Sequence, residues 1–235
     1  MTKTLLFDYG GTLDTGACHW AYILHDGYRA AGVELDEPTF RTAYVYAERA
    51  LARHPHIKPE DDFLTLLRKK VALEAENLQV QGAWNYSAAE SAEKVEAVAA
   101  YCDDFARRTT RHSALVLDRL AGRYAMGVVS NFYGNLSSVL RGYGLDGYFS
   151  FIVESAVVGV RKPSPDIFRL GVQRAGVAAE ETLAIGDSFT KDIVPATEAG
   201  CRTVWFKGRE WEEKCYDETL PSHVITSLDQ LTDFL

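Results

Sequence analysis

Short apolar runs bounded by glycine or acidic residues recur along the chain, and such runs are typical of buried strands. Helical periodicity fills the gaps between them, as in Leu136, Val139 and Leu140, which share one helical face. Strands that alternate with helices of this length indicate βαβ units and a parallel sheet covered on both faces. The expected strands are residues 3–8, 124–130, 149–153, 182–186 and 201–206, with a weaker one at 223–225.

The stretch from Thr15 to about Arg111 has a different pattern, because it contains no convincing strand and four helical segments follow one another. The fourth segment opens with Ser87 and Glu90, which have the spacing of a capping box. We therefore expect an α/β fold, in which a doubly wound, Rossmann-like parallel sheet carries an inserted all-helical cap domain. The core would comprise residues 1–14 and 112–235, and the cap residues 15–111.

Composition narrows the class of protein. A chain of 235 residues with 47% hydrophobic and 25% charged residues is ordinary for a soluble globular protein, and no apolar run is long enough to span a membrane. A formal net charge of −8 argues against nucleic acid as a partner. The four cysteines form no CxxC pair, which disfavours a zinc site and a disulfide framework. The apolar run Leu5 to Phe7 is too short for a signal peptide, so we expect a cytoplasmic location.

The most informative stretch runs from Phe7 to Asp14 and reads FDYGGTLD. A strand that ends in Asp8 and continues into two glycines exposes a carboxylate beside unhindered backbone amides, and such a carboxylate can attack phosphorus. An isolated Asp-x-Gly is more often a turn, so the motif alone is weak evidence.

Three further segments end strands or begin helices in the same half of the fold, where an α/β sheet gathers its ligands. Ser130 and Asn131 offer a hydroxyl and an amide that suit phosphate oxygens. Lys162 precedes a proline-marked helix start, where its ammonium could face negative charge. Asp187 and Asp192 supply carboxylate oxygens of the kind that Mg²⁺ prefers.

Together these segments resemble the four motifs of the haloacid dehalogenase-like hydrolases in kind, order and spacing. The resemblance covers residues 1–14 and 112–206 and favours subfamily I, whose helical C1 cap follows the first motif, as in phosphoglycolate phosphatase and β-phosphoglucomutase. It implies the following roles: Asp8 as nucleophile and Mg²⁺ ligand, Asp187 and the Gly10 carbonyl as further ligands, Lys162, Ser130, Asn131 and the Gly11 amide as phosphate-binding groups, Thr12 orienting Asp8, and Asp192 supporting the metal shell.

One departure from the family pattern affects turnover. Phosphatases of the family usually carry a second Asp two residues after the nucleophile, as general acid and base, and this chain has Gly10 there. Such assistance is worth roughly 10² to 10⁴ in rate. Three explanations stay open: a cap residue supplies the proton, the substrate has a good leaving group, or turnover is slow. The cap histidines His19, His25, His54 and His56 titrate in a useful range, but their patterns favour none of them.

The sequence therefore predicts a Mg²⁺-dependent phosphatase of a small phosphorylated metabolite, which works through an aspartyl-phosphate. One alternative is a dehalogenase-type hydrolase that acts at carbon without a metal. A second is a protein that binds a phosphorylated ligand with little turnover.

Overall fold

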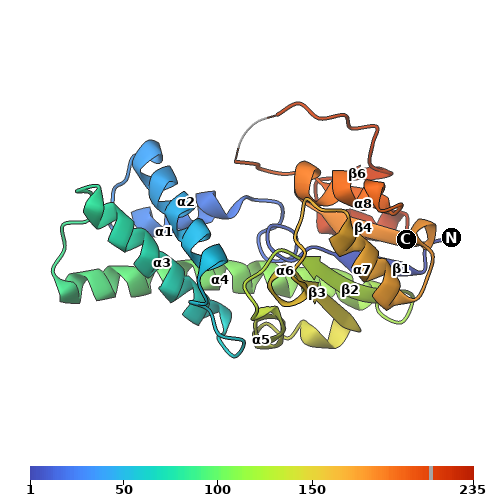
Figure 1. Ribbon diagram of the computed structural model, residues 1–235, viewed down its shortest axis with the longest axis horizontal. Coiled ribbons are helices and arrows are strands. Elements are labelled where there is room, and N and C mark those ends of the chain that lie inside the picture. Colours follow the sequence, from blue (N-terminus) through green and yellow to red (C-terminus); the bar gives the residue numbers. More distant parts are fainter. Residues whose placement is uncertain (212–213) are drawn as a thin grey trace.

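The computed structural model describes residues 1–211 and 214–235 and has an α/β core at one end and helices at the other (Figure 1). The core sheet has six parallel strands in the order β3-β2-β1-β4-β5-β6, so the predicted doubly wound parallel sheet is confirmed. All six expected strands are present, two with the predicted bounds and the others with ends shifted by at most two residues. They are β1 (Thr4–Phe7), β2 (Ala125–Ser130), β3 (Phe151–Glu154), β4 (Thr182–Gly186), β5 (Arg202–Phe206) and β6 (His223–Ile225).

Both faces of the sheet are buried, because successive side chains of a strand point to opposite sides. Leu5 and Phe7 of β1 belong to the same core cluster as Leu117 of α4 (Ala88–Leu120). Leu6 packs on the other face with Ile167 of α7 (Asp166–Ala175). The remaining core helices are α5 (Leu136–Gly142), α6 (Ser155–Val158) and α8 (Val194–Glu198), with short helical turns at Asp146–Tyr148, Ala179–Glu181, Phe189–Ile193 and Leu228–Asp233.

The segment predicted to be helical forms α1 (Trp20–Ala30), α2 (Glu37–Arg53), α3 (Phe63–Val80) and the first part of α4. Side chains cap each start: His19, Asp36, Asp62 and Ser87 accept hydrogen bonds from main-chain N–H groups of the first turn, and Ser87 with Glu90 makes the predicted capping box. No helix in the described ranges is both long and apolar enough to cross a membrane.

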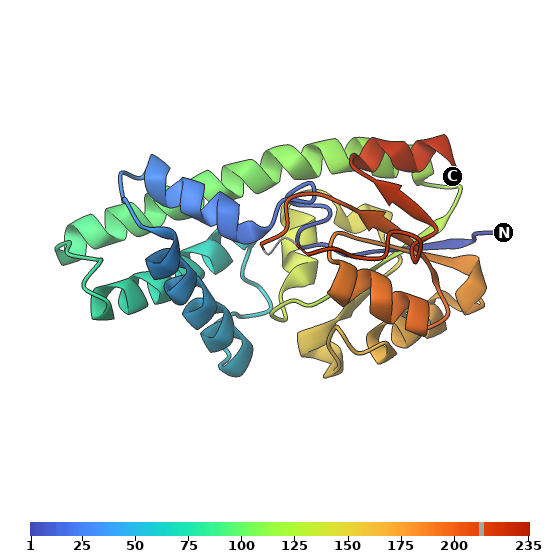
Figure 2. The same ribbon diagram turned by 90° about the horizontal axis from the view of Figure 1, so that it is seen from above.

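The helix α4 joins the two parts of the molecule. It is 33 residues long, and Figure 2 shows it running along both the helical bundle and the sheet. Val98 and Cys102 pack among the cap helices, whereas Val116 and Leu120 belong to the part nearer the sheet. The predicted boundary at residue 111 therefore falls inside a continuous helix, and the division into two domains stays a prediction.

Candidate active site

The site is built at the carboxyl ends of three adjacent strands. The central strand β1 pairs with β2 on one side and β4 on the other, with Phe7 opposite Val128 and Ile185. Because the strands are parallel and in register, the residues that follow them meet at one edge of the sheet. That edge brings together Asp8, Ser130 and Asp187, which are far apart in the sequence.

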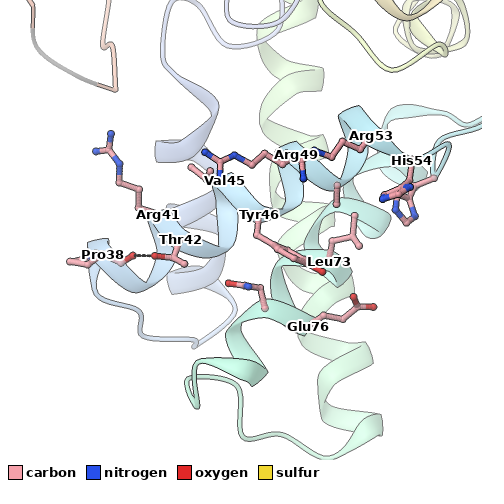
Figure 3. Close-up of a pocket in the computed structure, with 13 residues that line it drawn as sticks. Pro38, Arg41, Thr42, Val45, Tyr46, Arg49, Arg53, His54, Leu73 and Glu76 are labelled. Atoms are coloured by element: carbon pink, nitrogen blue, oxygen red, sulfur yellow. Dashed lines mark hydrogen bonds between the residues drawn. The ribbon is translucent and has the colours of Figure 1, made fainter.

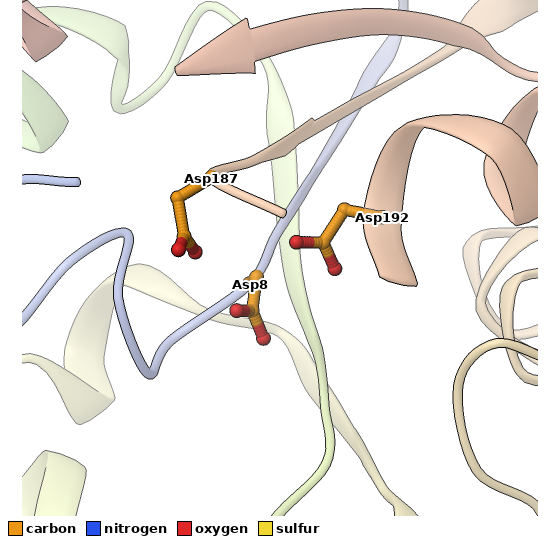
Figure 4. A group of neighbouring side chains, drawn as sticks. All are labelled: Asp8, Asp187 and Asp192. Carbon is orange, nitrogen blue, oxygen red and sulfur yellow. The ribbon is translucent and has the colours of Figure 1, made fainter. Parts of the chain in front are cut away.

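Three carboxylates form the centre of the site (Figure 4). One oxygen each from Asp8, Asp187 and Asp192 lie within 4.8 Å of one another. Burial and the neighbouring Asp192 and Asp8 carboxylates hold the pKa of Asp187 well above its ordinary value. The pKa of Asp192 is raised to about 6, chiefly by burial. The three carboxylates repel one another, and a cation bound among them would reduce this repulsion.

Lys162 supplies part of the compensating charge. Its Nζ donates to Oδ1 of Asp8 at 2.7 Å and to Oδ1 of Asp192 at 2.5 Å, and its side chain is 2% exposed. Burial alone would lower the pKa of this ammonium, but Asp192 and Asp8 outweigh burial and raise it. Lys162 is therefore a cation held between two of the three carboxylates.

The glycine turn after Asp8 packs against Asp187. Gly11 has φ +102°, and a Cβ added there would lie 2.4 Å from Oδ2 of Asp187, so only glycine fits. Thr12 donates from Oγ1 to Oδ1 of Asp187 at 3.0 Å and accepts from the Asp187 N–H at 3.1 Å. Thr12 was expected to orient Asp8; its hydroxyl is bonded to Asp187 instead, and a part in positioning Asp8 stays a prediction.

The groups expected to bind phosphate have partners of their own. Ser130 Oγ donates to Oδ1 of Asp8 at 2.7 Å, so it adjoins the residue predicted to be the nucleophile. The side-chain amide of Asn131 donates to the Lys162 carbonyl at 3.1 Å and accepts from the Lys162 N–H at 2.9 Å. Both polar ends of Asn131 are therefore used to hold the main chain of Lys162, and this side chain positions the lysine.

The Gly11 amide also differs from expectation, since it donates to Oδ1 of Asp14 at 2.7 Å. Asp14 was not predicted to belong to the site. It is fully buried, accepts from Trp20 Nε1 at 3.0 Å and has its pKa raised to about 7 by burial. Its bonds tie the glycine turn to the first residue of α1. An acid directly after the apolar Leu13 was the available signal, because buried acids need partners.

Gly10 stands where the family's phosphatases usually carry the general acid, and the space beside it is empty. A Cβ added at Gly10 would meet no atom within 4 Å, and Gly10 lacks the positive φ of its neighbour. A side chain there is therefore sterically allowed.

The cap histidines have partners away from the carboxylates. His19 accepts from the Ala21 N–H, and His25 stacks on Phe40. His54 and His56 line a hollow of about 960 Å³ between α2 and α3 (Figure 3). None of the predicted site residues lines this hollow, so it is separate from the carboxylate cluster.

The fold and this cluster define a doubly wound α/β protein with an acidic site at the carboxyl edge of its sheet. A sequence profile of the haloacid dehalogenase-like hydrolases matches residues 2–200. The chain belongs to this hydrolase family.

Curated relatives match over part of their length. Haloacid dehalogenase-like hydrolase domain-containing protein 3 of Danio rerio is 40% identical over 105 residues, which are 45% of this chain and 43% of that protein. Glyceraldehyde 3-phosphate phosphatase of Pyrococcus furiosus is 36% identical over 92 residues, or 39% of this chain and 38% of that protein. Pyrimidine 5'-nucleotidase YjjG of Escherichia coli is 30% identical over 122 residues, or 51% and 53% of the two chains. The match thus covers about half or less of the length of these relatives.

Solved structures share the fold over the whole chain. The putative hydrolase YfnB of Bacillus subtilis, bound to magnesium, has a TM-score of 0.59 at 22% identity and covers 100% of this chain and 98% of its own. A 2-haloacid dehalogenase of Pseudomonas syringae has a TM-score of 0.54 at 24% identity, with coverage of 99% and 97%. At sequence identities of 22% and 24%, these similarities show a shared fold alone.

Proposed function

We propose that the chain is a Mg²⁺-dependent phosphatase of small phosphorylated metabolites, with Asp8 as the nucleophile. One observation carries the proposal: the oxygens of Asp8, Asp187 and Asp192 lie within 4.8 Å of one another, and Lys162 is bonded to Asp8. Relatives named as phosphatases of glyceraldehyde 3-phosphate and of phosphoserine support the substrate class. We also propose a cytoplasmic location, as expected from the sequence.

The residues around Asp8 suit it to attack phosphorus. Ser130 and Lys162 both donate to Oδ1, which fixes the carboxylate and leaves Oδ2 to attack. The bond from Oδ2 to phosphorus forms as the bond to the leaving oxygen breaks, and the leaving alcohol takes up a proton. Water then attacks phosphorus, the bond from phosphorus to Oδ2 breaks, and inorganic phosphate leaves, which restores the Asp8 carboxylate. The proton that this water loses balances the proton that the alcohol took up. Lys162 stabilises the charge that develops on the phosphoryl oxygens.

The three carboxylates fit Mg²⁺, which takes oxygen ligands. Asp8, Asp187 and the Gly10 carbonyl would hold the ion, and Asp192 would support them. The absent Cβ of Gly11 makes the space that the Asp187 carboxylate fills. Burial, together with repulsion from Asp192 and Asp8, raises the pKa of Asp187, and a divalent cation would offset this cost of ionisation. When bound, Mg²⁺ neutralises the carboxylates and the substrate phosphate.

Purified protein tests the proposal with p-nitrophenyl phosphate, whose leaving group needs no proton. We expect phosphate release that requires Mg²⁺ and that Asp8→Asn abolishes, because an amide is a poor nucleophile. Ser137→Ala, a change on α5 outside the carboxylate cluster, serves as the matched control. Turnover that persists in Asp8→Asn would exclude the mechanism. Chloride release from a 2-haloacid without Mg²⁺ would instead establish the dehalogenase alternative.

A further inference from the structure

The cap and the core meet in a second polar cluster that the proposed chemistry does not use. The hydroxyl of Tyr133, a residue of the core, lies 3.1 Å from both carboxylate oxygens of Glu48 of α2 and donates its one proton to this carboxylate. Lys70 of α3 donates to Oε1 of Glu48. The carboxylate therefore joins two cap helices to the loop that follows β2.

This loop also reaches the nucleophile. Ser130, which donates to Asp8, stands three residues before Tyr133, so their Cα atoms are at most about 10 Å apart. Phe132, between them, packs edge-on against Tyr9, the residue after Asp8. One short segment thus links the Glu48 carboxylate of the cap to the residues around Asp8.

The side chains of Lys70 and Glu48 differ in how far they are exposed to solvent. The Lys70 side chain is 6% exposed, and its ammonium is occupied by Glu48 and by the face of Tyr44, 4.3 Å from the ring centroid. The Glu48 side chain is 35% exposed. A carboxylate offers about four acceptor positions; the Lys70 ammonium fills one of them, and the single proton of the Tyr133 hydroxyl fills one more. Among the described residues, the donors to Glu48 therefore leave acceptor positions free on its carboxylate, including one on Oε2.

Lys70 and Tyr133 fix the charge as well as the position of this acceptor. Although burial opposes ionisation, Lys70 and Tyr133 hold the pKa of Glu48 below its ordinary value, so the group is a carboxylate at neutral pH. Hydrogen bonds to an ionised acceptor are roughly twice as strong as neutral ones. A ligand O–H or N–H that reaches Oε2 would therefore be bound firmly.

The surrounding charge discriminates between possible donors. Burial lowers the pKa of the nearby His19 to about 4, and Lys191, Lys70 and Arg41 lower it further. The ammonium of Lys70 is bonded to the Glu48 carboxylate, so a second ammonium group, on the ligand, would be repelled there. A carboxylate on the ligand would be drawn to the Lys70 ammonium but could not donate to Glu48. A neutral hydroxyl meets neither objection.

We propose that Glu48 is the residue that selects the leaving group, by accepting a hydrogen bond from a neutral hydroxyl, so that the preferred substrates are phosphate monoesters of polyhydroxylated alcohols. Lys70 and Tyr133 are positioning residues in this scheme. The inference rests on the proposed phosphatase activity.

Four small phosphate esters test the inference: glycerol 3-phosphate, n-propyl phosphate, 3-phosphoglycerate and 3-aminopropyl phosphate. We expect wild-type kcat/KM to be highest for glycerol 3-phosphate. In Glu48→Gln the ratio of kcat/KM for glycerol 3-phosphate over n-propyl phosphate should fall about 10-fold, the value of one charge-assisted hydrogen bond. This ratio does not depend on the fraction of enzyme that is folded. Glu76→Gln, the same change at an exposed residue of α3, should leave it unaltered.

The remaining outcomes overturn the inference. A ratio unchanged in Glu48→Gln would show that the carboxylate only joins cap to core. Preference for 3-phosphoglycerate or 3-aminopropyl phosphate would assign the cluster to a charged leaving group. If p-nitrophenyl phosphate is hydrolysed while glycerol 3-phosphate has no advantage, this inference alone is wrong. If no ester is hydrolysed with Mg²⁺, the phosphatase proposal is wrong as well.

Discussion

The ammonium of Lys162 lies 2.7 Å from Oδ1 of Asp8, although 153 residues separate the two in the chain. Both side chains are nearly inaccessible to solvent, with 2% and 9% exposure. An ion pair this deeply buried is sensitive to the loss of one partner, because the other charge is then left without compensation. The pair therefore links the stability of the core to the chemistry of its site.

Lys162→Met should reduce both turnover and stability. Removing one partner of a buried pair costs about 3 to 5 kcal/mol, here because Asp8 and Asp192 lose their cation. Urea unfolding followed by circular dichroism, with and without Mg²⁺, measures the loss. We expect Mg²⁺ to restore part of it, since the ion would neutralise the same carboxylates. Equal unfolding midpoints for the variant and the wild type would contradict this account of the site.

Gly10→Asp should raise kcat for esters with poor leaving groups. Space around Gly10 admits a side chain, and a carboxyl there could protonate the departing oxygen. The expected gain is about 10-fold or more for an alkyl phosphate, with little change for p-nitrophenyl phosphate. Gly10→Asn, similar in size but unable to act as an acid and base, is the control. If both variants leave the alkyl rate unaltered, another group already donates the proton.

Gly11→Ala should disrupt the site without unfolding the core. The new Cβ would lie 2.4 Å from Oδ2 of Asp187, and φ +102° is unfavourable for alanine. Asp187 must then move, so we expect weaker Mg²⁺ binding by isothermal titration calorimetry and at least about 10-fold lower activity. Gly82→Ala, at a positive φ in the cap with no atom within 4 Å, shares the backbone strain but not the clash. Loss of Mg²⁺ binding in both variants would argue against a specific contact with Asp187.

Glu74 in the cap should make stability depend on pH. Burial raises its pKa to about 7, and Tyr28 is its hydrogen-bond donor at 2.8 Å, while Oε1 has no hydrogen-bond partner among the described residues. The folded state therefore keeps a proton that the unfolded chain releases at lower pH. The free energy of unfolding should fall as pH rises from about 4.5 to about 7.

Glu74→Gln, which carries no titrating proton, should reduce this fall. The slope of the free energy of unfolding against pH, measured by urea titration, separates the two proteins. Asp14 contributes in the same direction in both of them, so the difference isolates Glu74. Identical slopes would mean that Glu74 titrates normally in the folded state.

The sequence by itself determined the parallel sheet, the helical segment and the identity of the main acidic and basic residues. Such features follow from local patterns: apolar runs such as Leu5 to Phe7 are typical of a strand buried on both faces, and Ser87 with Glu90 caps a helix wherever that helix packs. The order of the motifs along the chain was sufficient to identify the family.

Only the tertiary structure decided which groups the site residues contact. A spacing does not tell whether the hydroxyl of Thr12 reaches Asp8 or Asp187, because the choice depends on how the glycine turn packs against the loop after β4. Asn131 and the Gly11 amide likewise found partners, Lys162 and Asp14, that no local pattern specifies. Glu48 was absent from the sequence prediction for the same reason. The role proposed for Glu48 depends on its hydrogen bond with Tyr133, 85 residues away, and such a bond between distant segments forms only when the chain has folded.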